Sequence, residues 1–404
     1  MDRMTIDDVD VAGKRVLTRV DFNVPLDGDR VTDDTRIRAA VPTIQKIVQS
    51  SGKCILMSHL GRPKGGPEPK YSVKPAAKRL GEVLGREVKT APDCVGDEVK
   101  ALVEAMQNGD VLMLENVRFH KEEEKNDPAF AAQLAALGDV YVNDAFGTAH
   151  RAHASTAGIP KILKSSAAGY LMKAELESLS RLLSAPQEGY VVILGGAKVG
   201  DKITVIHNLI TRASHMLIGG GMAYTFLKMK KIEIGKSLFD AEHATIAYNT
   251  LQVAENANPR KRCRLLLPSD HVIADNLDGA GASVATDASI PEGKIGVDIG
   301  PNTTSYYASI IRQGKTIFWN GPMGIFEKAA LATGTMEIAK AVADATSRGA
   351  FSVVGGGDSV AALAQSGLSD KISHVSTGGG ASLEFMGGID LPGVEALAKA
   401  PKKA

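Results

Sequence analysis

The chain has 404 residues, enough for two or three domains that each bury their own core. Its 47 Lys and Arg residues balance 46 Asp and Glu residues, so the net charge of +1 gives no bulk reason to bind nucleic acid or an anionic membrane. Residues 1–8 are acidic and lack the apolar core of a signal peptide, and no apolar run could span a bilayer, so we expect a cytoplasmic protein. Cys54, Cys94 and Cys263 form no CxxC pair, and their spacing indicates neither a zinc site nor a disulfide framework.

Short apolar runs alternate with amphipathic stretches along the whole chain. Strands are predicted at 15–20, 53–58, 110–114, 139–142, 190–194, 215–218, 264–267, 316–319, 351–354 and 374–376. Helices are predicted between some of them, at 35–49, 74–84, 129–137 and 336–345. This alternation predicts the α/β class, with two Rossmann-like lobes that are each a parallel sheet with helices on both faces.

The boundary between the lobes is predicted near residues 167–169. Residues 170–183 have the apolar spacing of one long helix, and a Pro- and Gly-containing stretch follows them. We therefore expect an N-terminal domain at 1–169, and a linker helix with a C-terminal domain at 170–390. A helix between two α/β domains suits a connector about which they close over a central cleft.

Basic and polar side chains follow the predicted strands of the first half, where the carboxyl ends of a parallel sheet bind ligands. Arg36 lies on the first turn of a predicted helix, where it opposes the helix dipole, so a ligand anion would explain its position. Each residue alone has a structural reading, such as an Asx turn or a turn histidine. Their convergence would be costly without an anion. The set is Asp21, Asn23, Arg36, His59, Arg62, Arg118, His150, Arg151 and His153.

Runs of glycine follow strands of the second half, at 195–196, 219–221, 355–357 and 378–380. Bare backbone N–H groups at such turns can bind nucleotide phosphates. The segment 355–359 has the order strand, glycine turn, helix N-terminus. Asp358 would repel a phosphate there unless a cation intervenes, which implies Mg²⁺. An N-capping role for Asp358 or Ser359 is compatible with this reading.

Two lysines, Lys198 and Lys202, lie one helical turn apart after the first glycine run and would repel unless they share an anion. Glu327 follows the strand at 316–319 and could accept hydrogen bonds from a ribose. The Walker A sequence, the G-x-G-x-x-G fingerprint and the protein-kinase signatures are absent. Phosphoryl transfer between two separately held substrates is the function that this combination indicates.

Five segments, in chain order, resemble the phosphoglycerate kinase family. They are RVDFNVP at 19–25, SHLGRP at 58–63, GGAKV at 195–199, WNGPMG at 319–324 and GGGD at 355–358. The resemblance implies an N-terminal lobe for 3-phosphoglycerate or 1,3-bisphosphoglycerate and a C-terminal lobe for ATP or ADP with Mg²⁺. It also implies a monomer whose C-terminal segment 391–404 packs back on the N-terminal lobe.

The resemblance assigns roles by position. Substrate-binding roles fall on Asp21, Phe22, Asn23, Arg36, His59, Leu60, Gly61, Arg62, Arg118 and Arg151. Nucleotide-binding roles fall on Lys202, Gly220, Asn320, Glu327, Gly356, Gly357, Asp358 and Ser359, with Asp358 as the metal ligand. The catalytic groups are predicted to be Arg36, Lys198, Lys202, Gly356 and Gly357. Residues 294–302 depart from the Trp- and Lys-containing pattern often seen around this segment, which leaves the adenine contacts open.

Two other functions are compatible with an α/β chain of this composition. A dehydrogenase would also use glycine turns, but the missing dinucleotide fingerprint argues against it. A non-catalytic scaffold would not need the Arg, Lys and Asp positions described above. An assay with ATP and 3-phosphoglycerate separates these alternatives.

Overall fold

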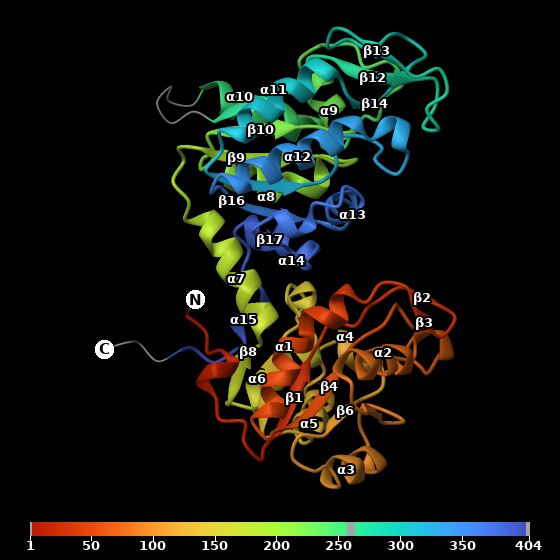
Figure 1. Cartoon of the computed structure of the whole chain (residues 1–404), viewed down its shortest axis with the longest axis vertical. Helices are drawn as coiled ribbons and strands as arrows, with labels where there is room; N and C mark the ends of the chain where they lie inside the picture. Colours follow the sequence, from red (N-terminus) through yellow and green to blue (C-terminus); the bar gives the residue numbers. More distant parts are fainter. Residues whose placement is uncertain (1, 257–262, 401–404) are drawn as a thin grey trace. The chain divides into compact units, whose positions relative to one another are not determined.

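The computed structural model describes residues 2–256 and 263–400 (Figure 1). Its internal packing divides the chain into two units. Unit 1 runs to Glu177 and takes in the residues from Asp390 onward, and unit 2 is Ser178–Ile389. The division falls inside helix α7 (Tyr170–Leu183), the helix predicted to join the two lobes. Among the described residues no helix is both long and apolar enough to cross a membrane.

Unit 1 is built on a parallel six-stranded sheet in the order β5-β6-β4-β1-β7-β8. The strands are β1 (Arg15–Arg19), β4 (Lys53–Met57), β5 (Lys89–Thr90), β6 (Val111–Met113), β7 (Val140–Asn143) and β8 (Ser166–Ala168). A two-stranded hairpin, β2 (Leu26–Asp27) with β3 (Arg30–Val31), follows β1. The helices are α1 (Thr35–Gln49), α2 (Lys74–Leu84), α3 (Asp97–Glu104), α4 (Lys121–Glu124), α5 (Pro128–Ala135), α6 (Ile159–Ile162) and α15 (Pro392–Glu395).

Burial on both faces explains why the strands of unit 1 are continuously apolar. Val16 and Leu17 point to opposite faces of the sheet, and both are fully buried. On one face of the sheet, strand residues pack against the apolar sides of α1 and α2, which include Ile44 and Leu80. The 3.6-residue period of these helices therefore matches the face that they cover.

Unit 2 has a second parallel sheet, in the order β11-β10-β9-β15-β16-β17. Its strands are β9 (Tyr190–Leu194), β10 (His215–Ile218), β11 (Arg264–Leu266), β15 (Thr316–Asn320), β16 (Phe351–Gly355) and β17 (His374–Val375). Numbered along the chain, this is the order 3-2-1-4-5-6 of a doubly wound sheet, whose ligands bind where the order reverses. That reversal lies between β9 and β15.

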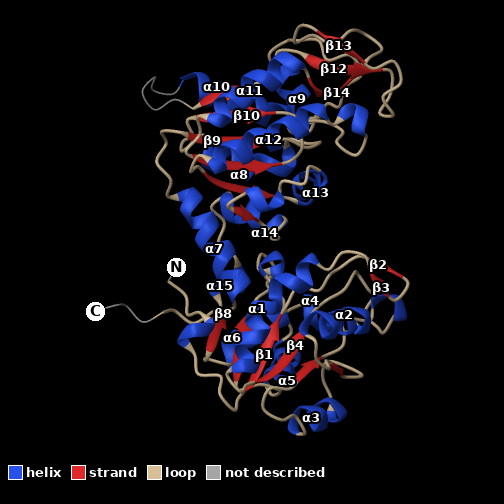
Figure 2. Ribbon diagram, viewed as in Figure 1, coloured by secondary structure: helices blue, strands red, loops and turns tan. Residues whose placement is uncertain are grey.

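The helices of unit 2 alternate with strands along the chain, and the last of them follows β17 (Figure 2). They are α8 (Ile203–Leu209), α9 (Met222–Met229), α10 (Ala244–Asn256), α11 (Pro301–Arg312), α12 (Thr333–Ser347), α13 (Gly357–Gln365) and α14 (Gly380–Met386). The α/β fold with two lobes is confirmed. The predicted strands agree with the observed ones to within one residue at each end, and the helices at 35–49, 74–84 and 170–183 are observed with those bounds.

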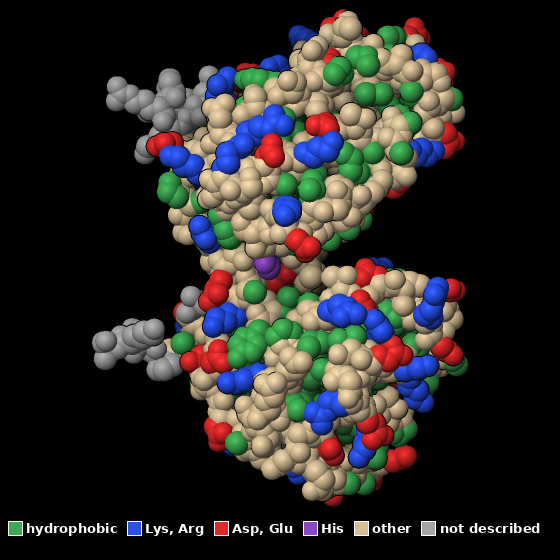
Figure 3. All heavy atoms as spheres, in the orientation of Figure 1, with side chains coloured by type: hydrophobic (Ala, Val, Ile, Leu, Met, Phe, Trp, Pro, Cys, Tyr) green, Lys and Arg blue, Asp and Glu red, His purple; other side chains and the backbone are tan. Residues whose placement is uncertain are grey.

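A small antiparallel sheet in unit 2 was not predicted. It has the order β13-β12-β14, formed by β12 (His271–Ala274), β13 (Ser283–Ala285) and β14 (Ile295–Ile299). Its strand β13 is mostly exposed and only three residues long, so no apolar run marks it in the sequence. Charges of both signs are interspersed over the visible faces of both units (Figure 3), in agreement with the balanced composition.

The C-terminal segment of unit 1 is held by backbone and side-chain contacts. The Gly393 N–H donates to the Ala149 carbonyl at 2.8 Å, and the Asn143 side chain donates to the Gly393 carbonyl at 3.2 Å. Arg3, which is 6% exposed, pairs with Glu395. The two ends of the chain therefore contribute to one unit.

Candidate functional site

The loops after β1, β4, β6 and β7 bring basic side chains together at one edge of the unit 1 sheet. The strands are parallel and adjacent, so their carboxyl ends meet at this edge. We use the name cationic cluster for Asp21, Arg36, His59, Arg118 and Arg151. Each of these residues was predicted as a substrate residue, and the three arginines all act on His59 by their charge.

Arg36 is held by an ion pair to the loop after β1. Its Nη1 donates to Asp21 Oδ2 at 2.8 Å, and its side chain remains 37% exposed. Asp34, the residue before α1, makes no capping hydrogen bond because its carboxylate pairs with Arg38 and Arg79. Asp33 instead provides a hydrogen bond at the N-terminus of α1, because its carboxylate accepts from the Thr35 N–H at 2.9 Å.

His59 lies buried at the centre of the cationic cluster. Its burial lowers its pKa well below the ordinary value, and nearby positive charges lower the pKa further: Arg19, Arg36, Arg118 and Arg151. The imidazole is therefore neutral at pH 7. Arg19 Nη2 lies 3.2 Å from His59 Nδ1, and because a guanidinium can only donate, Nδ1 is the acceptor. The proton then sits on Nε2, which is left as a donor.

Arg118 and Arg151 complete the cluster from the loops after β6 and β7. Arg118 is 6% exposed, donates to the Gly61 carbonyl at 2.9 Å, and has its Nε 3.1 Å from Glu124 Oε1. That Nε makes no hydrogen bond with good geometry among the described residues. Arg151 Nε donates to His150 Nε2 at 3.2 Å. Burial and these arginines lower the pKa of His153 to about 4, so it is also neutral.

A buried carboxylate lies beneath the cluster, and the sequence analysis did not find it. Glu123 is fully buried and accepts from both the N–H and the hydroxyl of Ser155. Ser155 Oγ in turn accepts from Arg19 Nε at 2.8 Å. Burial raises the pKa of Glu123, and Arg19 and the Ser155 hydrogen bonds oppose that shift. This chain connects Glu123 through Arg19 to His59; in sequence Glu123 is one of three consecutive glutamates, and nothing distinguishes it.

Three residues that were predicted to bind substrate have a structural role beside the cationic cluster: Phe22, Leu60 and Gly61. The Phe22 and Leu60 side chains belong to the hydrophobic core. The Phe22 N–H donates to Ser58 Oγ at 2.8 Å, and the Gly61 N–H donates to Asn23 Oδ1 at 2.9 Å. Only the remaining backbone groups of these residues are left for a ligand.

Arg62 is exposed in the loop after β4, and no other described side chain pairs with it. It is thus the least constrained of the predicted arginines. The contacts that define the cationic cluster do not include it.

In unit 2, the first two glycine runs pack against other backbone. A Cβ on Gly195 would lie 2.0 Å from the Pro322 carbonyl oxygen, and one on Gly220 would lie 2.6 Å from the Gly196 nitrogen. The N–H groups of these loops donate to protein carbonyls: Gly195 to Asn320, Gly196 to Pro322, Gly219 to Leu194 and Gly220 to Met323. The expectation of bare N–H groups was therefore wrong for these four glycines, because close packing of the loops uses their amides.

The third glycine run does present free amides. Gly356 has φ +92° and precedes α13, whose first N–H groups have no partner inside the helix. A side chain at Gly357 would meet nothing within 4 Å, so its backbone is open to a ligand. The Ser359 hydroxyl is buried and accepts a hydrogen bond from the Gly321 N–H. It therefore holds the loop after β15 in place.

Lys202 points to this helix end. Its Nζ donates to Asn320 Oδ1, and the Asn320 amide donates to the Gly355 carbonyl at 2.8 Å. Burial lowers the pKa of Lys202, while the charges of Asp201 and Asp358 oppose that shift. We name Lys202, Gly356, Gly357 and Asp358 the α13 site. It lies at the reversal of strand order, since Asn320 ends β15.

Lys198 and Glu327 are exposed residues of unit 2. Lys198 has no hydrogen-bond or ion-pair partner among the described residues, so its side chain is free to reach a ligand. Asp358, at the first turn of α13, is also exposed. Its carboxylate oxygens suit a hard cation such as Mg²⁺, and a cation there would relieve the repulsion between Asp358 and a phosphate on the same helix end.

The sequence profile of phosphoglycerate kinase matches residues 6–389 of this chain. The chain is 54% identical to the phosphoglycerate kinase of Chloroherpeton thalassium, over 99% of this chain and 100% of that protein. It is 55% identical to that of Anaeromyxobacter dehalogenans, over 97% and 98% of the two chains. The solved phosphoglycerate kinase structure from Coxiella burnetii is similar with a TM-score of 0.86 and 40% identity, covering 98% of each chain. The corresponding structure from Pyrococcus horikoshii has a TM-score of 0.84 at 31% identity, also over 98% of each chain.

Proposed function

Because this chain belongs to the phosphoglycerate kinase family, we propose that its cationic cluster binds the phosphoglycerate and that its α13 site binds the nucleotide phosphates. The chain is a phosphotransferase with a carboxyl group as acceptor. Its reaction is the reversible transfer of a phosphoryl group between 1,3-bisphosphoglycerate and ADP, a step of glycolysis.

One observation supports the assignment of the phosphoglycerate most directly. Four arginines surround His59, whose own charge is suppressed. Three carboxylates, Asp21, Glu123 and Glu124, lie beside these four arginines, so a positive excess remains that a small anion would neutralise. His59 Nε2 would donate to the same anion without adding charge.

The chemistry of the acceptor explains why a general base is not required. The nucleophile is a carboxylate, which has a pKa of roughly 3 to 4 and is ionised at pH 7. The obstacle is the approach of one anion to another. Catalysis therefore depends on positioning and on cancelling charge at the transferring group.

We assign that cancellation to groups of both units. Arg36 would contribute from the cationic cluster, and Lys202 with the Gly356 and Gly357 N–H groups from the α13 site. Lys198 is exposed and free to join them. Mg²⁺ held by Asp358 would neutralise part of the phosphate charge when it is bound.

Closure of the two units is part of this proposal. The two substrates are assigned to different units, so in-line transfer requires that they be brought together and that water be excluded. Small-angle scattering with both substrates present tests this: we expect a smaller radius of gyration than with either substrate alone. An unchanged radius would contradict closure.

The assay that tests the function couples ATP consumption to 3-phosphoglycerate. We expect Mg²⁺-dependent activity that disappears with a chelator, and no bound nicotinamide cofactor in the purified protein. Absence of phosphoglycerate-dependent turnover would refute the proposal, and a retained NAD would favour a dehydrogenase. Gel filtration and cell fractionation test the expected monomeric state and cytoplasmic location.

A further inference from the structure

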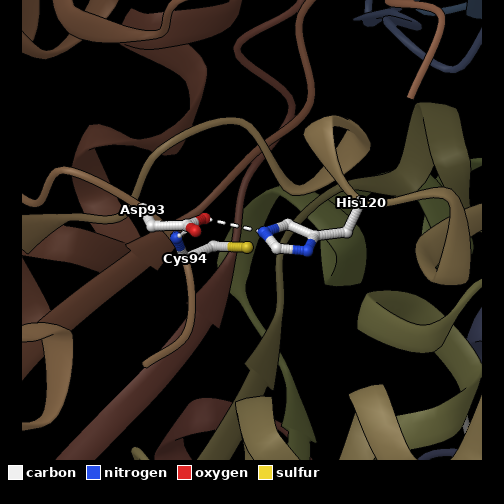
Figure 4. A group of neighbouring side chains, drawn as sticks. All are labelled: Asp93, Cys94 and His120. Atoms are coloured by element: carbon white, nitrogen blue, oxygen red, sulfur yellow. Dashed lines mark hydrogen bonds and ion pairs between the residues drawn. The ribbon is translucent and has the colours of Figure 1, made fainter. Parts of the chain in front are cut away.

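A mixed group of metal-binding side chains lies elsewhere in unit 1. Asp93 and Cys94 follow β5, and His120 lies directly before α4. One ligand atom from each residue lies within 4.8 Å of the other two (Figure 4). None of the three belongs to the cationic cluster, and the sequence spacing gave no indication that they meet.

The geometry does not suit a nucleophile relay. In such a relay the thiol and the carboxylate use different nitrogens of the imidazole. Here Asp93 Oδ1 lies 2.8 Å from His120 Nε2, and Figure 4 shows the sulfur on the same side of the ring as the carboxylate. Burial, then the charges of Asp93 and Glu123, raise the pKa of the Cys94 thiol well above its ordinary value. A protonated thiol is a poor nucleophile, and it must also lose its proton before it can coordinate a metal.

The surroundings of the group give it rigidity and access. The His120 ring stacks on Phe130, with 5.0 Å between ring centroids, which limits rotation of the imidazole. Cys94 is fully buried, whereas Asp93 and His120 line a cavity of about 960 Å³. An ion can therefore enter from the cavity, and water in the cavity can fill a coordination position that the protein leaves open.

We propose that Asp93, Cys94 and His120 bind one borderline divalent cation of the Zn²⁺ or Co²⁺ class, with water from the cavity as the fourth ligand. Oxygen, sulfur and imidazole nitrogen together favour such ions, whereas Mg²⁺ prefers oxygen alone. The ion replaces the thiol proton, which is released to solvent, and the imidazole proton moves to Nδ1 so that Nε2 can coordinate.

Binding requires a modest rearrangement of the group, in which the Asp93–His120 pair opens from 2.8 Å and both residues approach the sulfur. Bonds of about 2.0 to 2.3 Å in a tetrahedral site place ligand atoms roughly 3.3 to 3.8 Å apart. The present span of up to 4.8 Å must therefore close by about 1 Å. Asp93 and His120 are only partly buried and can move toward the fixed sulfur.

Cobalt titration of the metal-free, full-length protein tests the proposal. We expect one equivalent of Co²⁺ to produce a sulfur-to-cobalt charge-transfer band and tetrahedral d–d bands, and Zn²⁺ to displace it. Cys94→Ser should abolish the charge-transfer band, and His120→Asn should weaken binding by at least tenfold. Cys54→Ser and Cys263→Ser are matched controls, because both cysteines are buried and neither belongs to such a group among the described residues; both should keep the band.

Two results would overturn the proposal. One is a parent protein that shows no thiolate band at stoichiometric Co²⁺, and the other is a band that survives in Cys94→Ser. Circular dichroism shows whether each variant is folded, and Asp93→Asn gives a second test if Cys94→Ser is not. Kinase activity measured in parallel with Mg²⁺ and ATP keeps this test separate from that of the proposed function.

Discussion

The two proposed anion sites differ in their chemistry. The cationic cluster of unit 1 has charged side chains from four strand ends, whereas the α13 site of unit 2 has a helix N-terminus and one half-buried lysine. A small substrate offers few atoms, so several long side chains must converge on it. Nucleotide phosphates can be anchored by main-chain groups that are fixed in place by the fold. Substitution of side chains should therefore affect the two sites unequally.

Arg36→Ala should have the largest effect, because Arg36 is the most exposed cation of the cluster that is still oriented by an ion pair. We expect kcat to fall by about 10³-fold, the scale on which an arginine stabilises phosphoryl transfer. Nucleotide affinity, measured by titration calorimetry, should stay within about twofold of the parent because the α13 site is untouched.

Arg38→Ala is the control for that variant. Arg38 lies on the same helix, is 56% exposed and pairs only with Asp34 among the described residues. It should retain the parent kcat. A parent-like kcat in Arg36→Ala would remove Arg36 from the mechanism and with it the main contribution of unit 1 to charge cancellation.

Lys202→Ala should weaken both binding and rate, since Lys202 belongs to the α13 site. A loss of roughly 10- to 100-fold in nucleotide affinity corresponds to one charge-assisted contact of about 1.5 to 3 kcal/mol. Equilibrium titration with ADP measures it, and Lys340→Ala, an exposed lysine paired with Glu337, is the control. Unchanged ADP affinity would mean that the backbone amides alone hold the phosphates.

Glu123→Gln tests whether the buried carboxylate positions the cluster. The amide cannot accept from both groups of Ser155, so Arg19 and His59 should shift. We expect the KM for phosphoglycerate to rise about tenfold, the cost of one hydrogen bond to a charged group, with little change in the KM for nucleotide. Glu122→Gln, at the exposed neighbouring position, should match the parent. A lower KM would instead show that Glu123 opposes anion binding by its charge.

The contrast between side-chain and main-chain binding groups also explains which site residues could be predicted from the sequence. His59 and Arg118 could be predicted because polar residues after buried strands stand out against an apolar pattern, and Arg36 because a cation on the first turn of a helix opposes the helix dipole. The Gly355–Gly357 turn was also predictable as a helix start. Gly195 and Gly220 could not be separated from it, because the same residue type serves ligand approach and tight loop packing.

Burial and pairing across the chain were not visible in the sequence. Glu123 lies between two exposed glutamates, and only the fold shows that it is buried against Ser155. Asp93 and His120 are 27 positions apart, and they meet because β5 and β6 are neighbouring strands. Long-range contacts of this kind depend on strand order, which periodicity does not specify.

The smallest expected effect is a difference between the units in how their stability depends on pH. Each unit contains a buried carboxyl group whose pKa is raised. Burial raises the pKa of Asp144 in unit 1 to about 6, and that of Asp298 in unit 2 to about 7, from an ordinary value of 3.8. Asp144 Oδ1 accepts from the Leu171 N–H at 2.9 Å, and this hydrogen bond opposes the upward shift without cancelling it. In the unfolded chain both groups ionise near pH 4, so over this range the folded state holds more protons.

Stability should therefore fall as pH rises above about 4, by up to about 1.4 kcal/mol per pH unit for each group, and should level off above the folded pKa. Between pH 6 and 7 Asp298, with the higher pKa, is the larger contributor, so unit 2 should lose stability more steeply than unit 1. Hydrogen exchange in urea, resolved by mass spectrometry into peptides of each unit, measures this difference. Asp298→Asn should flatten the curve of unit 2 alone, and Asp144→Asn that of unit 1 below pH 6. Equal slopes in both units between pH 6 and 7 would show that groups other than these two carboxyls set the pH dependence.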